Sequence, residues 1–309
     1  CWECSLILRV GNMPVILRAT LAVLVAWVTF MNPTIVSAEK VIHTERSLYR
    51  NIVVFEDESE RCMRFTKQTG ARQTCYSLKS PDQLVFNYTK MMLASLYIQP
   101  QPRTILIIGL GGGTLPTTLS RIVPGVAIDV VEIDPAVVKV AKKYFGFAPG
   151  AGMSVTEEDG RVFVKRAISK GRTYDLVMLD AFDHEYIPEH LLTQEFLKEV
   201  KLILGNHGVL AANTWSSSRL YDHESVTYES VFGPFFNLKL NSRIILWKKG
   251  GLPPMSTIMN NAKSLERQFN ALGVSQKFLI PLFSAERDWK ADARVLTDQY
   301  SPSNLLNVR

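Results

Sequence analysis

The chain has 309 residues, of which 47% are hydrophobic and 21% are charged, and its formal net charge is +6. These values are typical of a globular protein with one or two domains, and the chain contains no internal repeat or low-complexity tract. The positive charge does not predict nucleic-acid binding, because Lys and Arg are spread along the chain with acidic residues between them.

Residues 1–38 differ from the rest of the chain. Arg18 precedes an apolar run at residues 19–30, and Val36-Ser-Ala38 supplies the small residues that a signal peptidase reads. The segment predicts a secretory signal or an uncleaved membrane anchor. Either would place the following residues outside the cytoplasm, exported or tethered to the membrane. The alternative is a cytoplasmic protein with a misread start, since Met13 would be a natural initiator.

Residues 39–100 predict a small β-rich domain with one helix. Apolar and β-branched residues cluster in short strands at residues 51–55 and 62–65, between charged turns. Residues 83–96 carry apolar side chains at helical spacing after Ser80-Pro81-Asp82, which is typical of a helix start. We expect this domain to precede the main sheet.

Two cysteines flank the expected hairpin turn of this domain. Cys62 and Cys75 lie on either side of Thr69-Gly70, so their strands could bring the two sulfur atoms opposite each other. An oxidising compartment would tolerate a disulfide there.

Residues 101–309 alternate between strands and helices. We expect strands at residues 104–108, 127–132, 153–157, 174–179 and 209–213, and helices after residue 114 and at residues 135–145, 160–169 and 193–204. This alternation predicts an α/β fold with a parallel sheet and helices on both faces. Two last strands at residues 232–249 and a helix at residues 256–272 follow, and residues 273–290 have no clear pattern.

A glycine-rich turn follows the first of these strands. Thr104 to Ile108 are apolar or β-branched, and they lead into Gly109, Gly111, Gly112 and Gly113 before a helical pattern begins. Such a turn needs glycines where the backbone takes positive φ or presses against a ligand. Ligands of parallel sheets bind beyond the carboxyl ends of the strands, where this turn lies.

Two acids at the next strand ends predict a nucleoside site. Glu132 ends the second strand 21 positions beyond Gly111, where an acid can accept hydrogen bonds from both ribose hydroxyls. Asp159-Gly160 follows the third strand, where the carboxylate could accept from an adenine amino group and the glycine would let the base lie flat. Asp159 also suits a helix N-cap, and the two roles are compatible.

An acidic cluster follows the fourth strand. Asp180 and Asp183 lie three positions apart, with Glu185 and Glu189 close by. Carboxylates favour the binding of a cationic amine, and one of them can accept its proton so that the nitrogen becomes nucleophilic. The alternative is that Asp180 caps a turn and the other acids are solvated.

No motif predicts a metal. His184 and His190 stand beside these acids without a ligand spacing, and Cys1 and Cys4 form a lone CxxC motif in the leader.

These motifs resemble the spermidine synthase family of aminopropyltransferases. The matching strings are Val131-Glu-Ile-Asp-Pro135, Asp159-Gly160 and Tyr174-Asp-Leu-Val-Met-Leu-Asp-Ala-Phe-Asp183. Residues 294–302 resemble the carboxyl end of a bacterial branch that includes transporter-fused members. The resemblance covers residues 45–305. It implies a methyltransferase-type Rossmann-like sheet preceded by a small N-terminal β domain, and a homodimer.

The resemblance also implies a reaction. The cofactor would be decarboxylated S-adenosylmethionine, and a small amine would attack the methylene carbon next to the sulfonium, releasing methylthioadenosine. Asp180 would be the catalytic carboxylate. The cofactor-binding candidates are Arg50, Gly109, Gly111, Gly113, Glu132, Asp159, Gly160 and Pro188, and the substrate-binding candidates are Tyr88, Asp180 and Asp183.

The chain departs from the family mainly where the amine would bind. It has Gly112 in place of an Asp, Lys90 in place of a Glu, Arg50 in place of a Gln, and Phe235-Phe236 where a tyrosine is expected. Fewer acids and more cations would weaken the binding of a dication.

These departures leave two alternatives open. The first is an S-adenosylmethionine-dependent methyltransferase, in which Arg50 or Lys90 could pair with the carboxylate of the cofactor. The second is a non-catalytic nucleoside-binding or interaction module outside the cytoplasm.

Overall fold

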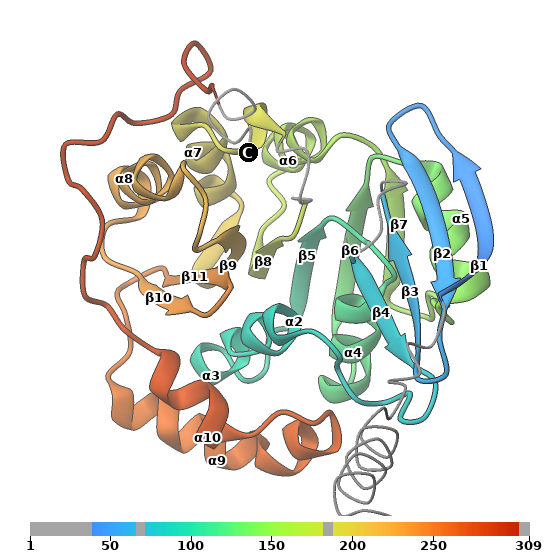
Figure 1. Ribbon diagram of the computed structural model, residues 1–309. Helices are drawn as coiled ribbons and strands as arrows, with labels where there is room; N and C mark the ends of the chain where they lie inside the picture. The colour runs from blue at the N-terminus through green and yellow to red at the C-terminus, as the bar shows by residue number, and fades with distance from the viewer. Residues whose placement is uncertain (1–38, 66–71, 182–187, 303–309) are drawn as a thin grey trace, which may run out of the picture. The chain divides into compact units, whose positions relative to one another are not determined.

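The computed structural model describes residues 39–65, 72–181 and 188–302 (Figure 1). The predicted leader, the turn at Thr69-Gly70 and the acids Asp183 and Glu185 lie outside the described residues.

A small antiparallel sheet comes first in the described chain. Its strands are β1 (Lys40–Arg46), β2 (Asn51–Glu56), β3 (Glu60–Arg64) and β4 (Thr74–Ser77), paired in that order. Both faces of β2 are covered, since Ile52 and Val54 pack in one apolar cluster and Phe55 packs in another.

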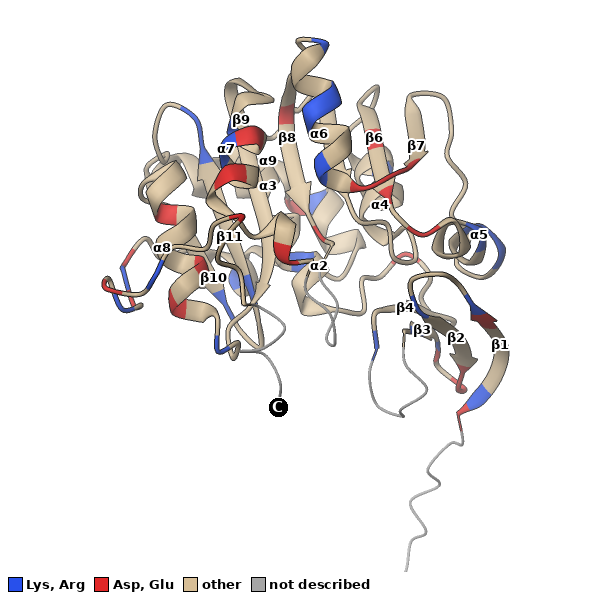
Figure 2. Ribbon diagram, turned by 90° about the horizontal axis from the view of Figure 1, so that it is seen from above, with Lys and Arg blue, Asp and Glu red and all other residues tan. Residues whose placement is uncertain are grey.

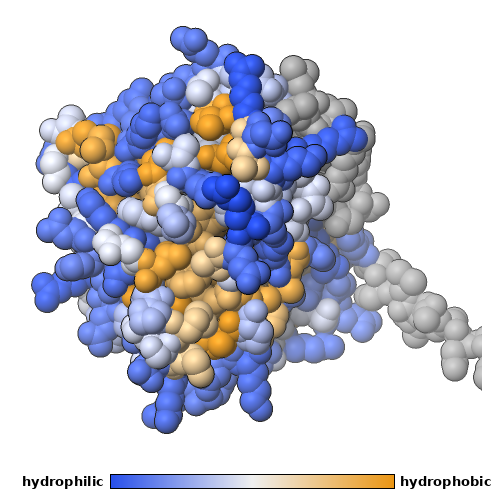
Figure 3. Space-filling view, turned by 90° about the vertical axis from the view of Figure 1, so that its left-hand side faces the viewer, coloured by the Kyte–Doolittle hydropathy of each residue, from blue (hydrophilic) through white to orange (hydrophobic). Residues whose placement is uncertain are grey.

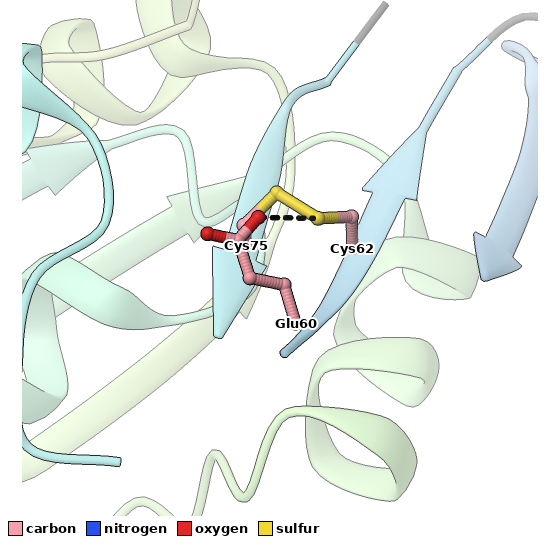
Figure 4. Close-up of side chains that lie close together, drawn as sticks. All are labelled: Glu60, Cys62 and Cys75. Carbon is pink, nitrogen blue, oxygen red and sulfur yellow. Dashed lines mark hydrogen bonds between the residues drawn. A yellow bond between two sulfur atoms is a disulfide. The ribbon is translucent and has the colours of Figure 1, made fainter. Parts of the chain in front are cut away.

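Cys62 on β3 pairs directly with Cys75 on β4, and a disulfide joins them (Figure 4). Their Cα atoms are 4.1 Å apart. Glu60 lies beside the two sulfur atoms, but sulfur atoms in a disulfide are not thiolate ligands, so this group offers a metal only one carboxylate.

The main sheet has seven strands in the order β10-β11-β9-β8-β5-β6-β7. The strands are β5 (Thr104–Ile108), β6 (Ala127–Glu132), β7 (Met153–Glu157), β8 (Tyr174–Leu179), β9 (Leu204–Trp215), β10 (Phe236–Lys239) and β11 (Ser242–Lys248). Strands β5 to β9 are parallel, whereas β11 and β10 run antiparallel at one edge. The chain runs from β5 to β6 and β7 on one side and then crosses to β8 and β9 on the other. Ligands of such sheets bind where the strand order reverses, here between β5 and β8.

Helices cover both faces of this sheet (Figure 1). They are α2 (Asn87–Met92), α3 (Ser95–Ile98), α4 (Thr114–Ile122), α5 (Pro135–Tyr144), α6 (Gly160–Ser169), α7 (Gln194–Leu202), α8 (Tyr221–Phe232), α9 (Met255–Ala271) and α10 (Gln276–Leu279), with short 3-10 turns η2 (Glu189–Leu191) and η3 (Ile280–Leu282). Ile105 and Ile107 of β5 pack in one apolar core with α2, α3, α4 and α9. Leu106 and Ile108 pack in the other with α6, α7 and α8. The predicted α/β fold with helices on both faces is confirmed.

Helix α5 connects the two sheets. Val138 and Ala141 belong to the core of the main sheet, whereas Val137 and Val140 pack against the small sheet. The small sheet is therefore held against the side of the main sheet that carries β6 and the glycine-rich turn.

The prediction of a single helix at residues 83–96 is wrong. Leu84 forms an isolated β-bridge with Tyr76, and its N–H donates to the Leu272 carbonyl, so the chain is still extended there. A tighter turn in which the Ala94 N–H donates to the Met91 carbonyl then separates α2 from α3.

Helix α8 was not predicted from the sequence. Its buried face carries Glu224, Ser225 and Thr227 beside apolar residues, so the helix lacks the apolar periodicity by which a sequence reveals a helix.

None of the helices in the described part of the chain combines the length and apolarity needed to cross a bilayer. Seen from above, Lys and Arg are interspersed with Asp and Glu over the described elements (Figure 2).

Candidate functional site

A cavity of about 820 Å³ opens at the carboxyl ends of β5, β6 and β8. The strand ends contribute Gly109, Glu132 and Asp180, the small domain contributes Arg50, and the first turn of α2 contributes Tyr88. The structure thus brings together candidates that lie far apart in the sequence.

The glycine-rich turn is shaped by close contacts between backbone segments. Gly109, Gly111 and Gly113 have φ angles of 102°, 54° and 80°, which glycine adopts without strain. A Cβ atom on Gly109 would lie 2.3 Å from the carbonyl oxygen of Asp180. The turn and the end of β8 therefore touch through main-chain atoms, and of these three glycines Gly109 and Gly111 line the cavity.

Glu132 is buried at the end of β6, with 8% of its surface exposed. One carboxylate oxygen accepts from the Leu110 N–H and the other from the Asp134 N–H, each at 3.0 Å. Burial raises the pKa of Glu132, while these two hydrogen bonds oppose the rise. Each oxygen keeps a lone pair, so the carboxylate is suited to accept from vicinal hydroxyls.

Asp159 is the N-cap of α6. Its Oδ1 accepts from the Arg161 and Val162 N–H groups at 2.9 and 3.0 Å, as the N-cap reading of the sequence predicts. Its Oδ2 lies 2.7 Å from Nε2 of His190, and this hydrogen bond is the main cause that lowers the pKa of Asp159. A Cβ atom on Gly160 would lie 2.5 Å from Cγ2 of Ile108, so this glycine lets α6 approach β5.

Asp180 faces the cavity directly after β8. The Asn213 amide donates to its Oδ1 at 2.9 Å. Burial raises the pKa of Asp180 to about 7, with a smaller contribution from Glu132, and the Asn213 hydrogen bond opposes the rise. A carboxylate with this pKa can accept a proton near neutral pH and release it again.

Tyr88 lines the same end of the cavity as Asp180. Burial, and next the charge of Asp180, raise the pKa of its hydroxyl well above the usual range. The hydroxyl is therefore a neutral donor or acceptor, and its ring stacks on Phe86 at 5.8 Å. Trp215 from β9 and Leu240 and Asn241 from the β10–β11 turn complete this wall.

Other candidates lie as follows. Arg50 lines the cavity, with its guanidinium 4.2 Å from the centre of the Phe65 ring and its Nε 4.0 Å from Asp134 Oδ2. Pro188 lines the cavity just before η2. Gly113 and Gly160 differ in their contacts: Gly160 lines the cavity, whereas Gly113 packs against the Phe147 ring. Asp183 lies outside the described residues.

Two residues at which the chain departs from the family lie outside the described lining of the cavity. Lys90 is not among the residues that line it. Phe235 is buried and stacks on Trp289 at 5.0 Å, away from the cavity lining. The structure gives a packing reason for a glycine at position 112, because a Cβ atom there would lie 2.7 Å from the Thr74 side chain.

Comparison with known proteins identifies the family. Residues 85–237 match the spermine/spermidine synthase domain. A polyamine aminopropyltransferase from Vibrio vulnificus is 45% identical over 284 residues, which make up 90% of this chain and 95% of that protein. The chain belongs to the spermine/spermidine synthase family.

Solved structures agree with the fold of this family. Spermidine synthase from Thermotoga maritima has a TM-score of 0.63 at 21% identity, over 80% of this chain and 85% of that one. Human methyltransferase-like protein 13 in complex with SAH has a TM-score of 0.53 at 26% identity, over 70% of this chain and 100% of that one. The fold is thus shared by spermidine synthases and a methyltransferase.

Sequence reasoning missed several residues that line the cavity of this chain. His190 was considered only as a metal ligand, although its position two residues after Pro188 could have indicated the cavity wall. Trp215 and Asn241 had no local signal, because neither follows a strand-to-helix turn. The contact of Thr74 with Gly112 joins segments that only the fold brings together.

Proposed function

We propose that this chain is a transferase that moves an aminopropyl group from decarboxylated S-adenosylmethionine to a small amine. One observation carries the proposal: Asp180, with its pKa of about 7, shares a cavity with the glycine-rich turn and Glu132. The identity to a polyamine aminopropyltransferase over most of the chain supports the same reaction.

The donor would lie across the carboxyl ends of β5 to β7. Glu132 would accept from the two ribose hydroxyls, and Asp159 with His190 would border the adenine. Gly109 and Gly111 would let the backbone approach the sulfonium side of the donor. This orientation leaves the aminopropyl arm directed toward Asp180, which follows the neighbouring strand.

The chemical step needs a base and a fixed line of attack. Asp180 would accept a proton from the acceptor ammonium, so that the nitrogen lone pair becomes available. The nitrogen then forms a bond to the methylene carbon, the carbon–sulfur bond breaks, and its electron pair stays on sulfur. The products are methylthioadenosine and a secondary ammonium, and Asp180 passes the proton that it accepted to solvent. Tyr88 and, from its place in the sequence, Asp183 would hold the acceptor amine.

The test is product analysis by mass spectrometry. Purified protein is incubated with decarboxylated or ordinary S-adenosylmethionine and a panel of amines. Methylthioadenosine together with an aminopropylated amine is the expected result. Formation of S-adenosylhomocysteine instead would identify a methyltransferase. Failure to bind either donor or to form either product would favour the non-catalytic module.

Methyl transfer from S-adenosylmethionine is the second candidate function. The observation in its favour is that the turn has no acid at Gly112, where Thr74 fills the space, while Arg50 and Arg72 line the cavity. A guanidinium suits a carboxylate better than it suits an ammonium group. Measuring both donors with wild type and with Arg50→Gln would separate the candidates, because the substitution should weaken use of the carboxylate-bearing donor much more than use of the decarboxylated one.

We also propose a homodimer and export. Figure 3 shows an apolar area bordered by hydrophilic residues on the side where α8 and β10 lie, which is consistent with self-association. Sedimentation analysis would detect the dimer.

The Cys62–Cys75 disulfide is consistent with an oxidising compartment. Fusing residues 13–38 to a reporter that is active only outside the cytoplasm would test export, and an inactive reporter would count against it.

A further inference from the structure

Asp298 has no part in the proposed reaction, yet it forms a bidentate ion pair with Arg161 at the start of α6. Its two carboxylate oxygens lie 2.6 and 2.8 Å from Nη1 and Nη2 of Arg161, although the residues are 137 positions apart. Arg161 forms a second such pair with Glu199, at 2.8 and 2.9 Å. The Arg161 side chain is only 11% exposed, whereas that of Asp298 is 42% exposed, so the pair stands at the protein surface with its guanidinium held inside.

The segment around Asp298 also holds residues 188–194. The Thr193 hydroxyl donates to Asp298 Oδ1 at 2.7 Å, and the Gln194 N–H donates to the Leu296 carbonyl at 2.8 Å. Farther along, the Ser301 hydroxyl donates to the Glu189 carbonyl at 3.2 Å. The C-terminal segment therefore contacts this stretch at three points.

The first residues of this stretch form part of the cavity wall. Pro188, His190 and Leu191 line it, and His190 is hydrogen-bonded to Asp159. Arg161 touches both sides of this arrangement, because its backbone N–H donates to Asp159 and its guanidinium donates to the His190 carbonyl at 3.5 Å. Displacement of Arg161 would thus move the two residues that border the expected adenine position.

We propose that Asp298 is a positioning residue for the donor: through Arg161 and Thr193 it holds His190 against Asp159 and so fixes the adenine end of the cavity. The inference rests on the proposed function, since it assigns the adenine to this end. Asp298 itself does not line the cavity and contacts no reacting atom. Its effect should therefore be on donor affinity and not on the chemical step.

The experiment compares Asp298→Ala and Asp298→Asn with wild type. Calorimetry gives the Kd for methylthioadenosine, and steady-state kinetics give kcat and the KM values of donor and acceptor. We expect Asp298→Ala to raise the methylthioadenosine Kd and the donor KM about tenfold, the scale of one lost charged hydrogen bond. The acceptor KM and kcat should stay within about twofold. Asp298→Asn keeps the shape of the side chain and removes its charge, so it provides the same comparison if the alanine variant does not fold.

A matched control is Asp129→Ala. Asp129 also pairs with an arginine and accepts from two hydroxyls, those of Tyr174 and Ser154, but it does not line the main cavity. This variant should lose thermal stability without a change in the methylthioadenosine Kd. An Asp298→Ala variant that behaves like this control would overturn the proposal.

A double variant tests the route of the effect. If Asp298 acts through His190, then Asp298→Asn combined with His190→Ala should bind methylthioadenosine no more weakly than His190→Ala alone. Fully additive losses would contradict the proposed route. Suppose that the wild type binds methylthioadenosine and is active, and that Asp298→Ala has the same Kd and donor KM. This result would refute only the present inference. Wild type that neither binds nor reacts refutes the proposed function, and the inference with it.

Discussion

The function that we propose gives the cavity a nucleoside end and an amine end, and the side chains at these two ends are held in different ways. At the nucleoside end, backbone N–H groups fix the carboxylates, those of Leu110 and Asp134 for Glu132 and those of the first turn of α6 for Asp159. At the amine end, Asp180 has a side-chain partner, Asn213, and the wall consists of side chains from separate segments.

This difference indicates which part of the cavity can vary without a change of fold. Backbone geometry at a strand-to-helix turn repeats whenever the fold repeats, so the acids that depend on it are kept in place by the fold. Side chains such as Trp215 and Leu240 can change without altering the backbone. We therefore expect the choice of amine to reside at the amine end, and donor recognition to tolerate little change.

The largest expected effect is that of Asp180→Asn. Removing the base should lower kcat by roughly 10²- to 10⁴-fold, while the Kd of methylthioadenosine stays nearly unchanged because the nucleoside end is intact. Single-turnover kinetics and calorimetry measure the two quantities. Turnover that persists in this variant would remove Asp180 from its assigned role.

The pH profile is the next test. Because the pKa of Asp180 is raised to about 7, its basic form is lost as pH falls through that value. At saturating donor, kcat should fall by about tenfold per pH unit below the pKa. The Asn213 hydrogen bond opposes the rise of this pKa, so Asn213→Ala should move the acid limb of the profile to higher pH. A profile that is flat from neutral to acidic pH would contradict the role of Asp180 as the base.

Glu132→Gln addresses the nucleoside end. The amide keeps the shape but loses the charge and one acceptor, so the Kd of methylthioadenosine should rise about tenfold, as expected for a charged hydrogen bond. The acceptor KM should not change. Asp129→Ala serves again as the control, because this acid lies outside the main cavity. Equal changes in both constants would mean that the two ends are not separable.

The smallest effect is expected at the contact of Gly112 with Thr74. Gly112→Ala should lower the free energy of unfolding by about 1 to 3 kcal/mol, because its Cβ would clash with the threonine side chain. Combining it with Thr74→Ser, which removes the methyl group, should recover part of this loss. Thermal or denaturant unfolding would measure both. A single variant as stable as wild type would show that Thr74 moves aside at no cost.

Much of the fold could be predicted because its main sheet follows local rules. The central parallel strands β5 and β8 carry continuous apolar runs, and the helices after β6 and β7 begin at Asp134 and Asp159, which cap them. Helix α8 escaped prediction because polar residues stand on its buried face, and some of them make tertiary hydrogen bonds. The Thr227 hydroxyl, for example, accepts from the Leu296 N–H. No local pattern signals such a contact.

The site, like the fold, could be predicted only in part from the sequence. Glu132 and Asp159 could be placed because they lie at the carboxyl ends of strands, Glu132 as the last residue of β6 and Asp159 two residues after β7, and their assigned roles stay predictions. His190 could not be placed, because its position depends on Asp159 and on the C-terminal segment. The cavity wall at Trp215 and Asn241 depends on how β9 pairs with β11, which brings Trp215 opposite Ser242.

The contact between Gly109 and the Asp180 carbonyl also matters for protein engineering. Any side chain introduced at position 109 would push apart the two strands that orient donor and base, so libraries that vary this turn should yield mostly inactive clones. The hairpin tip at Leu240 and Asn241 has no such restriction and borders the same chamber. Variation there offers the more direct way to redirect the enzyme toward a bulkier or differently charged acceptor.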